Sequence, residues 1–231
     1  MKVLAIETST MLGGAAVVDE QDGLIAEIRL NIKTTHSERL MTAVDTILKQ
    51  SELKLNDIDA VAVSTGPGSF TGLRIGLSTA KGLCYASGRP LVTVPTLEAF
   101  AWNFTFSKHP ICLMLDARKK EVYAAVFQWK ERGFKKIISE TIVKPSELFK
   151  KLVGSTVFAG DGVKLYEDQI TEHMKDRAIL APPEKMVPFP SNIAMLGLRK
   201  ALKREFSSAS YAVPFYIRKS EAEVKWEEKN L

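Results

Sequence analysis

The sequence is poor in the residues that build metal sites and disulfide frameworks. It has two cysteines, Cys84 and Cys112, and three histidines, His36, His109 and His173, in 231 residues. The cysteines do not form a Cys-x-x-Cys pair, and no histidine stands three or four positions from another. Zinc and iron sites usually need such paired ligands. We therefore expect no metal site, no disulfide framework and a reducing, cytoplasmic setting.

Long apolar runs are also missing. No segment approaches the roughly 20 apolar residues of a membrane-spanning helix, so we expect no association with a membrane. The chain starts with a strand-like run, residues 3–6, rather than with a basic segment ahead of an apolar one, so a signal peptide is not expected. The composition, 45% apolar and 26% charged, is typical of a soluble protein with one large domain or two small lobes.

The charge balance is mildly basic, with a net charge of +5. Such a balance permits weak attraction to RNA. Lysines and arginines are spread along the sequence rather than clustered. The sequence therefore favours a solvated surface over a dedicated RNA-binding patch.

Signatures of catalysis are equally scarce. The glycine-rich segment 65–72 (TGPGSFTG) has no Gly-Lys-Ser/Thr of a P-loop, and its last glycine comes one place late for a dinucleotide-binding loop. Ser69 lacks the Gly-x-Ser-x-Gly context of a hydrolase nucleophile. A glycine loop before a helix can bind an anion, or it can be a tight turn with Gly66 or Gly68 at positive φ. We favour the turn and expect no catalytic residue.

Hydrophobic periodicity predicts alternating strands and helices. The expected strands are residues 2–8, 13–18, 24–30, 58–64, 91–94, 111–116, 121–129, 137–143 and 156–159. The expected helices are residues 36–50, 70–86, 96–104, 146–152, 163–173 and 192–205. Such alternation is typical of α/β folds, and the charged residues from 219 onward are expected to be frayed or partner-dependent.

The two halves of the chain resemble each other. A spacing of 109 residues separates Glu7 from Asp116 and also separates Ala15-Ala16-Val17 from Ala124-Ala125-Val126. This repeat predicts a duplicated α/β unit with two lobes facing a cleft. Glu7 and Asp116 would face each other across it, and the hydroxyls and backbone N–H groups of residues 8–10 (Thr8, Ser9, Thr10) would contact phosphate.

Several motifs resemble one protein family. They are LAIETST (4–10), HSERL (36–40), GPGSFTGLRIG (66–76), PTLE (95–98), DAR (116–118) and PFYIR (214–218). In order and nearly from end to end they are similar to the TsaB (YeaZ) family, paralogues of TsaD/Kae1 in the actin-like ATPase superfamily. The resemblance implies a two-lobed actin-like ATPase fold (ASKHA, a duplicated ribonuclease H-like fold). The expected lobes are residues 1–105 and 106–231, and the sequence leaves open whether helix 192–205 packs back on the first lobe.

The resemblance also implies a function. Family members heterodimerise with TsaD and work with TsaE to place threonylcarbamoyl on the adenosine beside the tRNA anticodon. TsaD holds a metal on a His-x-x-x-His motif, whereas here His36 is followed by Leu40, and the chain is too short for the larger TsaD insertions. We therefore expect a non-catalytic subunit without a tightly bound cofactor, with ATP bound only in the complex. It would contact tRNA only indirectly and form a homodimer when alone.

Two helices carry the interface that the resemblance implies. The candidate interface residues are His36, Arg39, Leu40, Met41, Val44, Ile47, Phe70, Gly72, Arg74, Ile75, Gly76 and Lys81. The candidate vestigial nucleotide or phosphate site is Glu7, Thr8, Ser9, Thr10 and Asp116. Gly72 and Gly76 share a helix face, where either helix 36–50 or a second subunit could approach closely.

Two other functions remain as alternatives. In an ATP-dependent phosphotransferase of the same fold, Glu7 or Asp116 could bind Mg²⁺ or act as a base, but a carboxylate at a strand end is more often a turn cap. A metalloprotease-like protein is less favoured, because the sequence shows no set of metal ligands.

Overall fold

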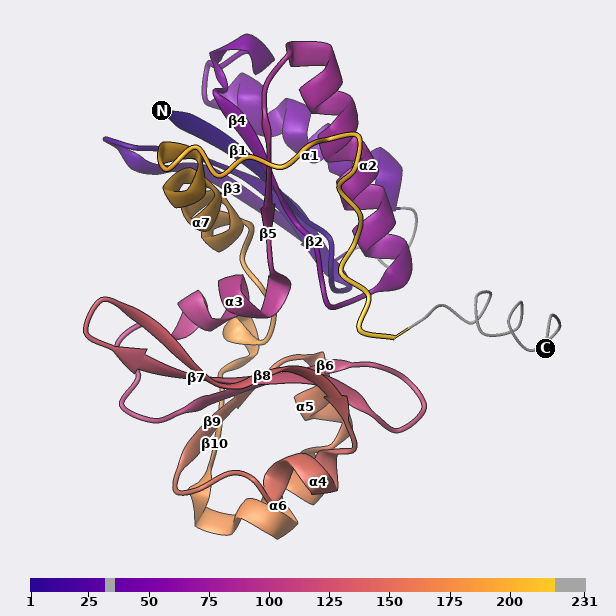
Figure 1. Cartoon of the computed structure of the whole chain (residues 1–231), viewed down its shortest axis with the longest axis vertical. Coiled ribbons are helices and arrows are strands. Elements are labelled where there is room, and N and C mark those ends of the chain that lie inside the picture. Colours follow the sequence, from indigo (N-terminus) through magenta and orange to yellow (C-terminus); the bar gives the residue numbers. More distant parts are fainter. Residues whose placement is uncertain (32–35, 219–231) are drawn as a thin grey trace, which may run out of the picture.

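The structure is a computed structural model that describes residues 1–31 and 36–218. Two five-stranded sheets with their helices lie one above the other along the long axis of the molecule, and α3 lies between them (Figure 1). Among the described residues, no helix combines the length and the apolar character needed to cross a membrane.

The first sheet has the strand order β3-β2-β1-β4-β5. Its strands are β1 (Lys2–Glu7), β2 (Leu12–Asp19), β3 (Gly23–Asn31), β4 (Ala60–Ser64) and β5 (Leu91–Val94). The helices in this part of the chain are α1 (His36–Gln50), α2 (Phe70–Ser87) and α3 (Thr96–Ala101), with 3₁₀ turns at Leu55–Asp57 and Trp102–Phe104. β1 pairs antiparallel with β2 and parallel with β4.

The second sheet has the order β10-β9-β6-β7-β8. Its strands are β6 (Ile111–Asp116), β7 (Val122–Lys130), β8 (Gly133–Val143), β9 (Thr156–Ala159) and β10 (Ala178–Leu180). The helices that follow are α4 (Pro145–Phe149), α5 (Asp161–Leu165), α6 (Glu167–Met174) and α7 (Pro190–Leu202), with 3₁₀ turns at Lys175–Arg177 and Pro183–Lys185. The expected lobe boundary, between residues 105 and 106, lies between β5 of the first sheet and β6 of the second.

The strand order confirms the duplication, because β6 to β10 repeat the arrangement of β1 to β5. The residue alignment, however, is off by one. The spacing of 109 pairs Leu4 and Ile6 with Leu113 and Leu115. Leu4 and Ile6 pack with the helices α1 and α2, whereas Leu113 and Leu115 pack with α3 and not with α4 to α6. Because side chains alternate between the faces of a strand, a shift of one residue reverses the face. Glu7 and Asp116 are therefore not equivalent positions.

The first sheet is covered on both faces, which explains why β1 and β4 are almost wholly apolar. On one face Leu4 and Ile6 pack with Leu40, Val44 and Ile47 of α1 and with residues of α2. On the other face the alternate strand residues pack against α7. Figure 1 shows α7 on the left and the α1–α2 pair on the right, with the sheet between them.

The chain returns to the first sheet after completing the second. α7 packs on β1, β2 and β4, and Gly197 leaves room there because a Cβ at this position would meet the Cβ of Ala62. Residues 205–218, which we call the C-terminal strap, then run beside β5 and α2 toward the second sheet (Figure 1). Ser207 N bonds Leu91 O at 2.8 Å, and Phe215 N bonds Thr65 O at 2.7 Å.

Candidate functional site

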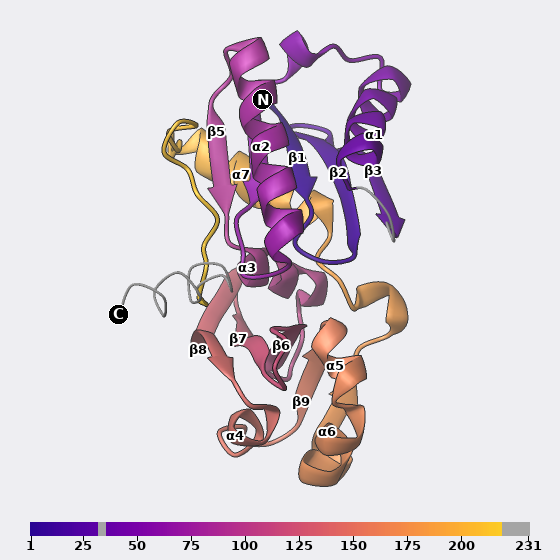
Figure 2. The same cartoon turned by 90° about the vertical axis from the view of Figure 1, so that its right-hand side faces the viewer.

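A cleft of about 450 Å³ lies between the two sheets. Its walls come from the β1–β2 connection, the glycine-rich loop at the start of α2, the end of β6 with the turn after it, and the start of α5. The polar residues that line it are Ser9, Thr10, Ser69, Thr71, Asp116, Arg118, Lys119, Tyr123, Asp161 and Arg218. The start of α2 and the β1–β2 connection both point toward the second lobe (Figure 1 and Figure 2).

The structure brings only part of the predicted phosphate site to this cleft. Ser9, Thr10 and Asp116 line it, but Glu7 and Thr8 are fully buried behind its wall. The Thr8 hydroxyl donates to the carbonyl oxygen of Gly72 at 2.7 Å. The prediction that Glu7 faces Asp116 across the cleft is therefore wrong, because the Glu7 side chain is fully buried and bonds Ser9 instead of opening onto the cleft.

The carboxylate of Glu7 is fully buried, and Ser9 and Ser64 are the polar residues beside it. Its Oε1 accepts hydrogen bonds of 2.5 Å from both the backbone N–H and the hydroxyl of Ser9. Its Oε2 and the hydroxyl of nearby Ser64 have no hydrogen-bond partner among the described residues. Burial raises the pKa of Glu7 from 4.5 to about 7, although the hydrogen bonds from Ser9 oppose this shift. A carboxyl group held this way has no solvent-facing oxygen for a ligand.

The glycine-rich loop is a turn built against the β1–β2 connection. Gly66 has φ +119°, and a Cβ at Gly68 would collide with the backbone of Ser9. Ser69 caps α2 by accepting from Gly72 N at 3.2 Å, while Ser69 N donates to Ser9 O at 2.7 Å. Two of the N–H groups at the start of α2 are thus occupied within the chain, which leaves fewer of them for an anion.

Asp116 belongs to a small acidic and basic cluster on the other wall. Asp161 Oδ1 accepts from Asp116 N at 2.9 Å, and Arg118 forms an ion pair with Asp116 at 3.2 Å. Burial raises the pKa of Asp161, and the charge of Asp116 adds to the shift. The sequence prediction missed Asp161, since its Gly160-Asp161-Gly162 motif looks like an ordinary turn. Among the described residues, no three His, Cys, Asp or Glu side chains form a group able to hold a metal ion.

Helices α1 and α2 pack side by side on one face of the first sheet. Their outer surface carries Arg39, Met41, Arg74 and Tyr85, of which Tyr85 is 93% exposed and Met41 45% exposed. Lys81 and Ile75 are partly buried, and Ile75 packs on the core beneath. The side chain of His36 lies outside the described residues. We call the surface formed by Met41, Arg74, Gly82 and Tyr85 the α1–α2 face.

Several predicted interface residues point inward instead. Leu40, Val44 and Ile47 are at most 2% exposed and pack in the core of this chain. A Cβ at Gly72 would collide with the carbonyl oxygen of Thr8, and one at Gly76 would collide with its hydroxyl. The glycine face therefore fits the end of β1 rather than a second helix. An amphipathic stripe cannot by itself show whether its partner is the same chain or another one.

Comparison with known proteins supplies a family. The family model described as "TsaD: tRNA N6-adenosine threonylcarbamoyltransferase" matches residues 23–226. The protein named tRNA threonylcarbamoyladenosine biosynthesis protein TsaB from Bacillus subtilis is 32% identical, with 98% of each chain covered. The chain belongs to the TsaB (YeaZ) family. The TsaB of Escherichia coli is 31% identical, with 96% of each chain covered.

A solved structure agrees with this assignment. The structure described as YeaZ from Pseudomonas aeruginosa has a TM-score of 0.77 and 25% identity, and the match covers 93% of this chain and 99% of that one. Together with the two repeated sheets, it confirms the predicted α/β, duplicated actin-like fold of the TsaB family. Two of the motifs that resemble the family meet at the cleft, where Ser9 and Thr10 of LAIETST lie beside Gly68 and Ser69 of GPGSFTG and Ser69 N donates to Ser9 O.

Proposed function

We propose that this TsaB-family chain is a non-catalytic partner and activator subunit in the synthesis of threonylcarbamoyladenosine on tRNA. It heterodimerises with TsaD, works with TsaE and contacts ATP only within that complex. When TsaD is absent, the same surface pairs with a second copy of the chain. Membership of the TsaB family supports a role in threonylcarbamoyladenosine synthesis. The α1–α2 face supports binding to a partner subunit.

The observation that carries this proposal is the exposure of Tyr85 and Met41 on the outer surface of two packed helices. Tyr85, in the last turn of α2, is 93% exposed, and a tyrosine so exposed buries apolar area once a partner binds. Arg39 of α1 and Arg74 and the partly buried Lys81 of α2 supply the charged groups that the polar rim of a protein interface needs. Gly82 has no atom near the position of a Cβ, so a partner can approach α2 closely there.

The cleft supports the non-catalytic part. Glu7, the carboxylate at the end of β1, is buried, and the N–H groups of Ser69 and Gly72 already have partners. A nucleotide phosphate would have to compete with these internal hydrogen bonds. We therefore expect the isolated chain to bind ATP weakly and not to hydrolyse it at a useful rate.

Reconstitution tests the proposal. TsaD, TsaE, the adenylate-forming enzyme, ATP, threonine, bicarbonate and unmodified tRNA are combined with and without this chain, and modified adenosine is counted. The variant Gly82→Trp fills the surface of α2 without touching the core and should abolish both TsaD binding and activation. Lys151→Trp, on the second lobe and exposed, is the matched control and should behave like wild type.

Two outcomes would contradict the proposal. If modification proceeds equally well without the chain, the partner role is wrong. If Gly82→Trp activates normally, the α1–α2 face is not the contact surface. ATP hydrolysis by the chain alone, abolished in Asp116→Asn, would instead favour a phosphotransferase that uses the cleft.

A further inference from the structure

A second cleft lies between the two lobes, away from the one described above. It has a volume of about 460 Å³ and is bounded by α3, α7 and the β7–β8 hairpin. Its walls include Trp102, Arg132, Phe134, Arg199, Lys200 and Lys203. In Figure 1 these elements lie on the left of the molecule, whereas the start of α2 and the turn after β6 lie on the right.

The charges around this second cleft are mostly positive. Five basic side chains line it, namely Arg132, Lys136, Arg199, Lys200 and Lys203, against the two acidic ones of Glu98 and Glu205. Two of the basic residues come from the β7–β8 hairpin and three from the end of α7 and the residue after it, segments more than 60 positions apart, so the sequence alone does not bring the two groups together. The fold creates a basic patch that composition could not reveal.

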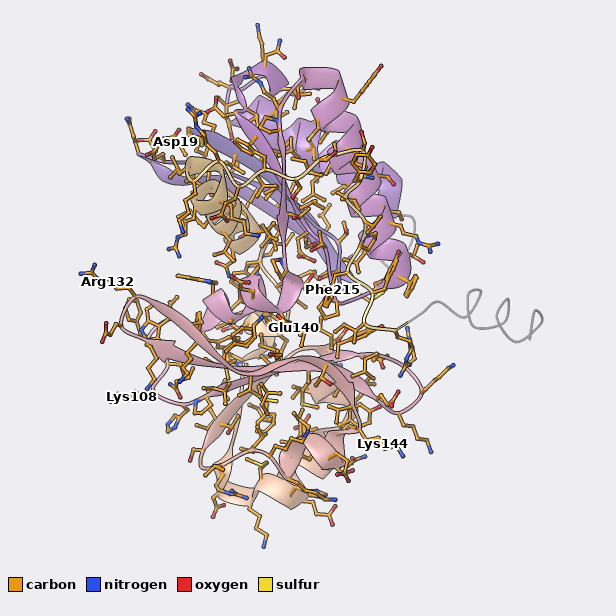
Figure 3. All side chains as sticks on the ribbon, viewed as in Figure 1. Asp19, Lys108, Arg132, Glu140, Lys144 and Phe215 are labelled. Carbon is orange, nitrogen blue, oxygen red and sulfur yellow. The ribbon has the colours of Figure 1, made fainter. Side chains whose placement is uncertain are left out.

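Three of these five cations are available to a ligand. Lys136 pairs with Glu140 at 2.7 Å, and Lys200 donates to the carbonyl oxygen of Thr93 at 2.9 Å. Within residues 1–31 and 36–218, no acidic side chain forms an ion pair with Arg132, Arg199 or Lys203. All three are exposed. Figure 3 shows Arg132 extending outward from the end of the hairpin, with Lys108 on the same side.

Aromatic rings lie beside these cations. The rings of Trp102, Trp129 and Phe134 contact one another edge to face, with centroids 5.0 to 5.7 Å apart. The guanidinium of Arg199 lies 4.1 Å from the centre of the Trp102 ring. Phe106, which is 79% exposed, extends the cluster by contacting Trp129. An arginine stacked on a ring is held in place and presents its N–H groups at the edge of the guanidinium plane.

We propose that this second cleft binds the phosphate backbone of RNA, and in particular of the tRNA substrate. The proposal rests on the proposed function in that tRNA is the molecule being modified, and it departs from the expectation drawn from the sequence that the chain contacts tRNA only indirectly. The three unpaired cations attract a polyanion. The exposed ring of Phe106, at the end of the aromatic cluster that begins with Trp102 and Phe134 in the cleft wall, gives an unpaired base a surface for stacking. An acidic protein segment would satisfy the charges but would leave the exposed ring of Phe106 without a role.

The test is fluorescence anisotropy with labelled, unmodified tRNA, using the chain alone and the chain mixed with TsaD. The cleft variant carries Arg132→Gln, Arg199→Gln and Lys203→Gln. The control variant carries Lys144→Gln, Lys151→Gln and Lys164→Gln, which remove the same charge from exposed sites on the second lobe. Lys144 lies far from Arg132 in Figure 3. Both variants are checked for an unchanged thermal midpoint.

We expect the cleft variant to bind tRNA at least tenfold more weakly and the control variant to change affinity less than twofold. The slope of log Kd against log salt should fall by about 0.7 to 0.9 for each phosphate that the variant no longer neutralises. Equal reductions of tRNA affinity in the two variants, or no tRNA binding by either the chain or its complex with TsaD, would overturn the proposal. If the cleft variant loses TsaD binding instead of tRNA binding, as judged by size-exclusion chromatography, the cleft is a protein interface and not an RNA site. If wild-type chain fails to bind TsaD, the proposed function fails, while tRNA binding by the chain alone still decides this inference.

Discussion

The ring of Tyr216 lies flat on the ring of Phe70, with centroids 4.1 Å apart and planes 2° from parallel. The hydroxyl of the same tyrosine accepts a hydrogen bond of 2.9 Å from Arg74 Nε. Two residues later, Arg218 donates to the carbonyl oxygen of Ala117 at 2.8 Å and contacts Glu121. The C-terminal strap therefore joins the first turns of α2 to the turn that follows β6, across the edge of the first cleft.

We predict that Tyr216→Ala releases the strap. The loss of a stacked aromatic pair and one hydrogen bond should lower the free energy of unfolding by about 1 to 2 kcal/mol. Cleavage by trypsin after Arg218 should become several-fold faster, because its hydrogen bonds to the second lobe no longer hold. Tyr211→Ala is the matched control, since Tyr211 is 85% exposed. Equal protease sensitivity in the two variants would show that the stack does not hold the strap.

A second prediction concerns Glu7, whose pKa rises from 4.5 to about 7 in the folded chain. An acid with a raised folded pKa binds more protons in the folded state between these values, so stability falls as pH rises through this window. From the shift alone, this loss is roughly 2 to 3 kcal/mol between pH 5 and pH 8. Glu7→Gln keeps the acceptor for Ser9 and removes the titration.

Urea unfolding of both proteins at pH 5 and pH 8 measures this effect. The stability of Glu7→Gln relative to wild type should rise by about 2 to 3 kcal/mol from the lower to the higher pH. A difference that does not change with pH would mean that Glu7 ionises normally in the folded chain.

Two glycines of α2 should respond to alanine in opposite ways. At Gly72 the new Cβ meets the carbonyl oxygen of Thr8, so α2 must move and the chain should lose about 1 to 3 kcal/mol of stability. At Gly82 nothing lies near the new Cβ, and alanine should add about 0.5 to 1 kcal/mol because it restricts the unfolded chain. Thermal and urea unfolding of the two variants decide this. A destabilised Gly82→Ala would show that the outer side of α2 is already covered.

The thiols offer a test of the core. Cys84 is 5% exposed and Cys112 fully buried, and burial raises the pKa of Cys84 to about 11 and that of Cys112 further. Since the thiolate is the reactive form, both should react with a disulfide reagent at pH 8 only as fast as the chain unfolds. The rate with native protein, compared with that in denaturant, checks this. Rapid reaction of one thiol in native protein would locate a region that opens.

Much of the fold could be predicted from local pattern. The predicted helix 36–50 has the bounds of α1, and the predicted helix 70–86 ends one residue before α2. Both have strong periodicity, and Ser69 and Gly88 mark the ends of α2 with an N-cap and a left-handed C-cap. The predicted helix 163–173 is instead two short helices, α5 and α6, separated at Tyr166.

The rest depends on contacts between distant segments. No local pattern shows that Thr8 fills the space above Gly72 and Gly76, so the sequence pointed to a helix partner for the glycine face. The strand β10 has only three residues and the C-terminal strap has no periodicity, so neither could be predicted. The cleft position of Asp161 and the second cleft arise from the juxtaposition of the two sheets, which periodicity does not encode.

The return of α7 and the strap to the first sheet has a consequence for synthesis. Val3 and Ala5 of β1 lie against Ile193 and Ala194 of α7, nearly the full length of the chain away. During translation these strand residues leave the ribosome long before the helix that covers them. One face of the first sheet therefore stays open to water, or to a chaperone, until almost the whole chain has been made. A stalled or C-terminally shortened chain would expose that apolar face and become a target for aggregation or degradation.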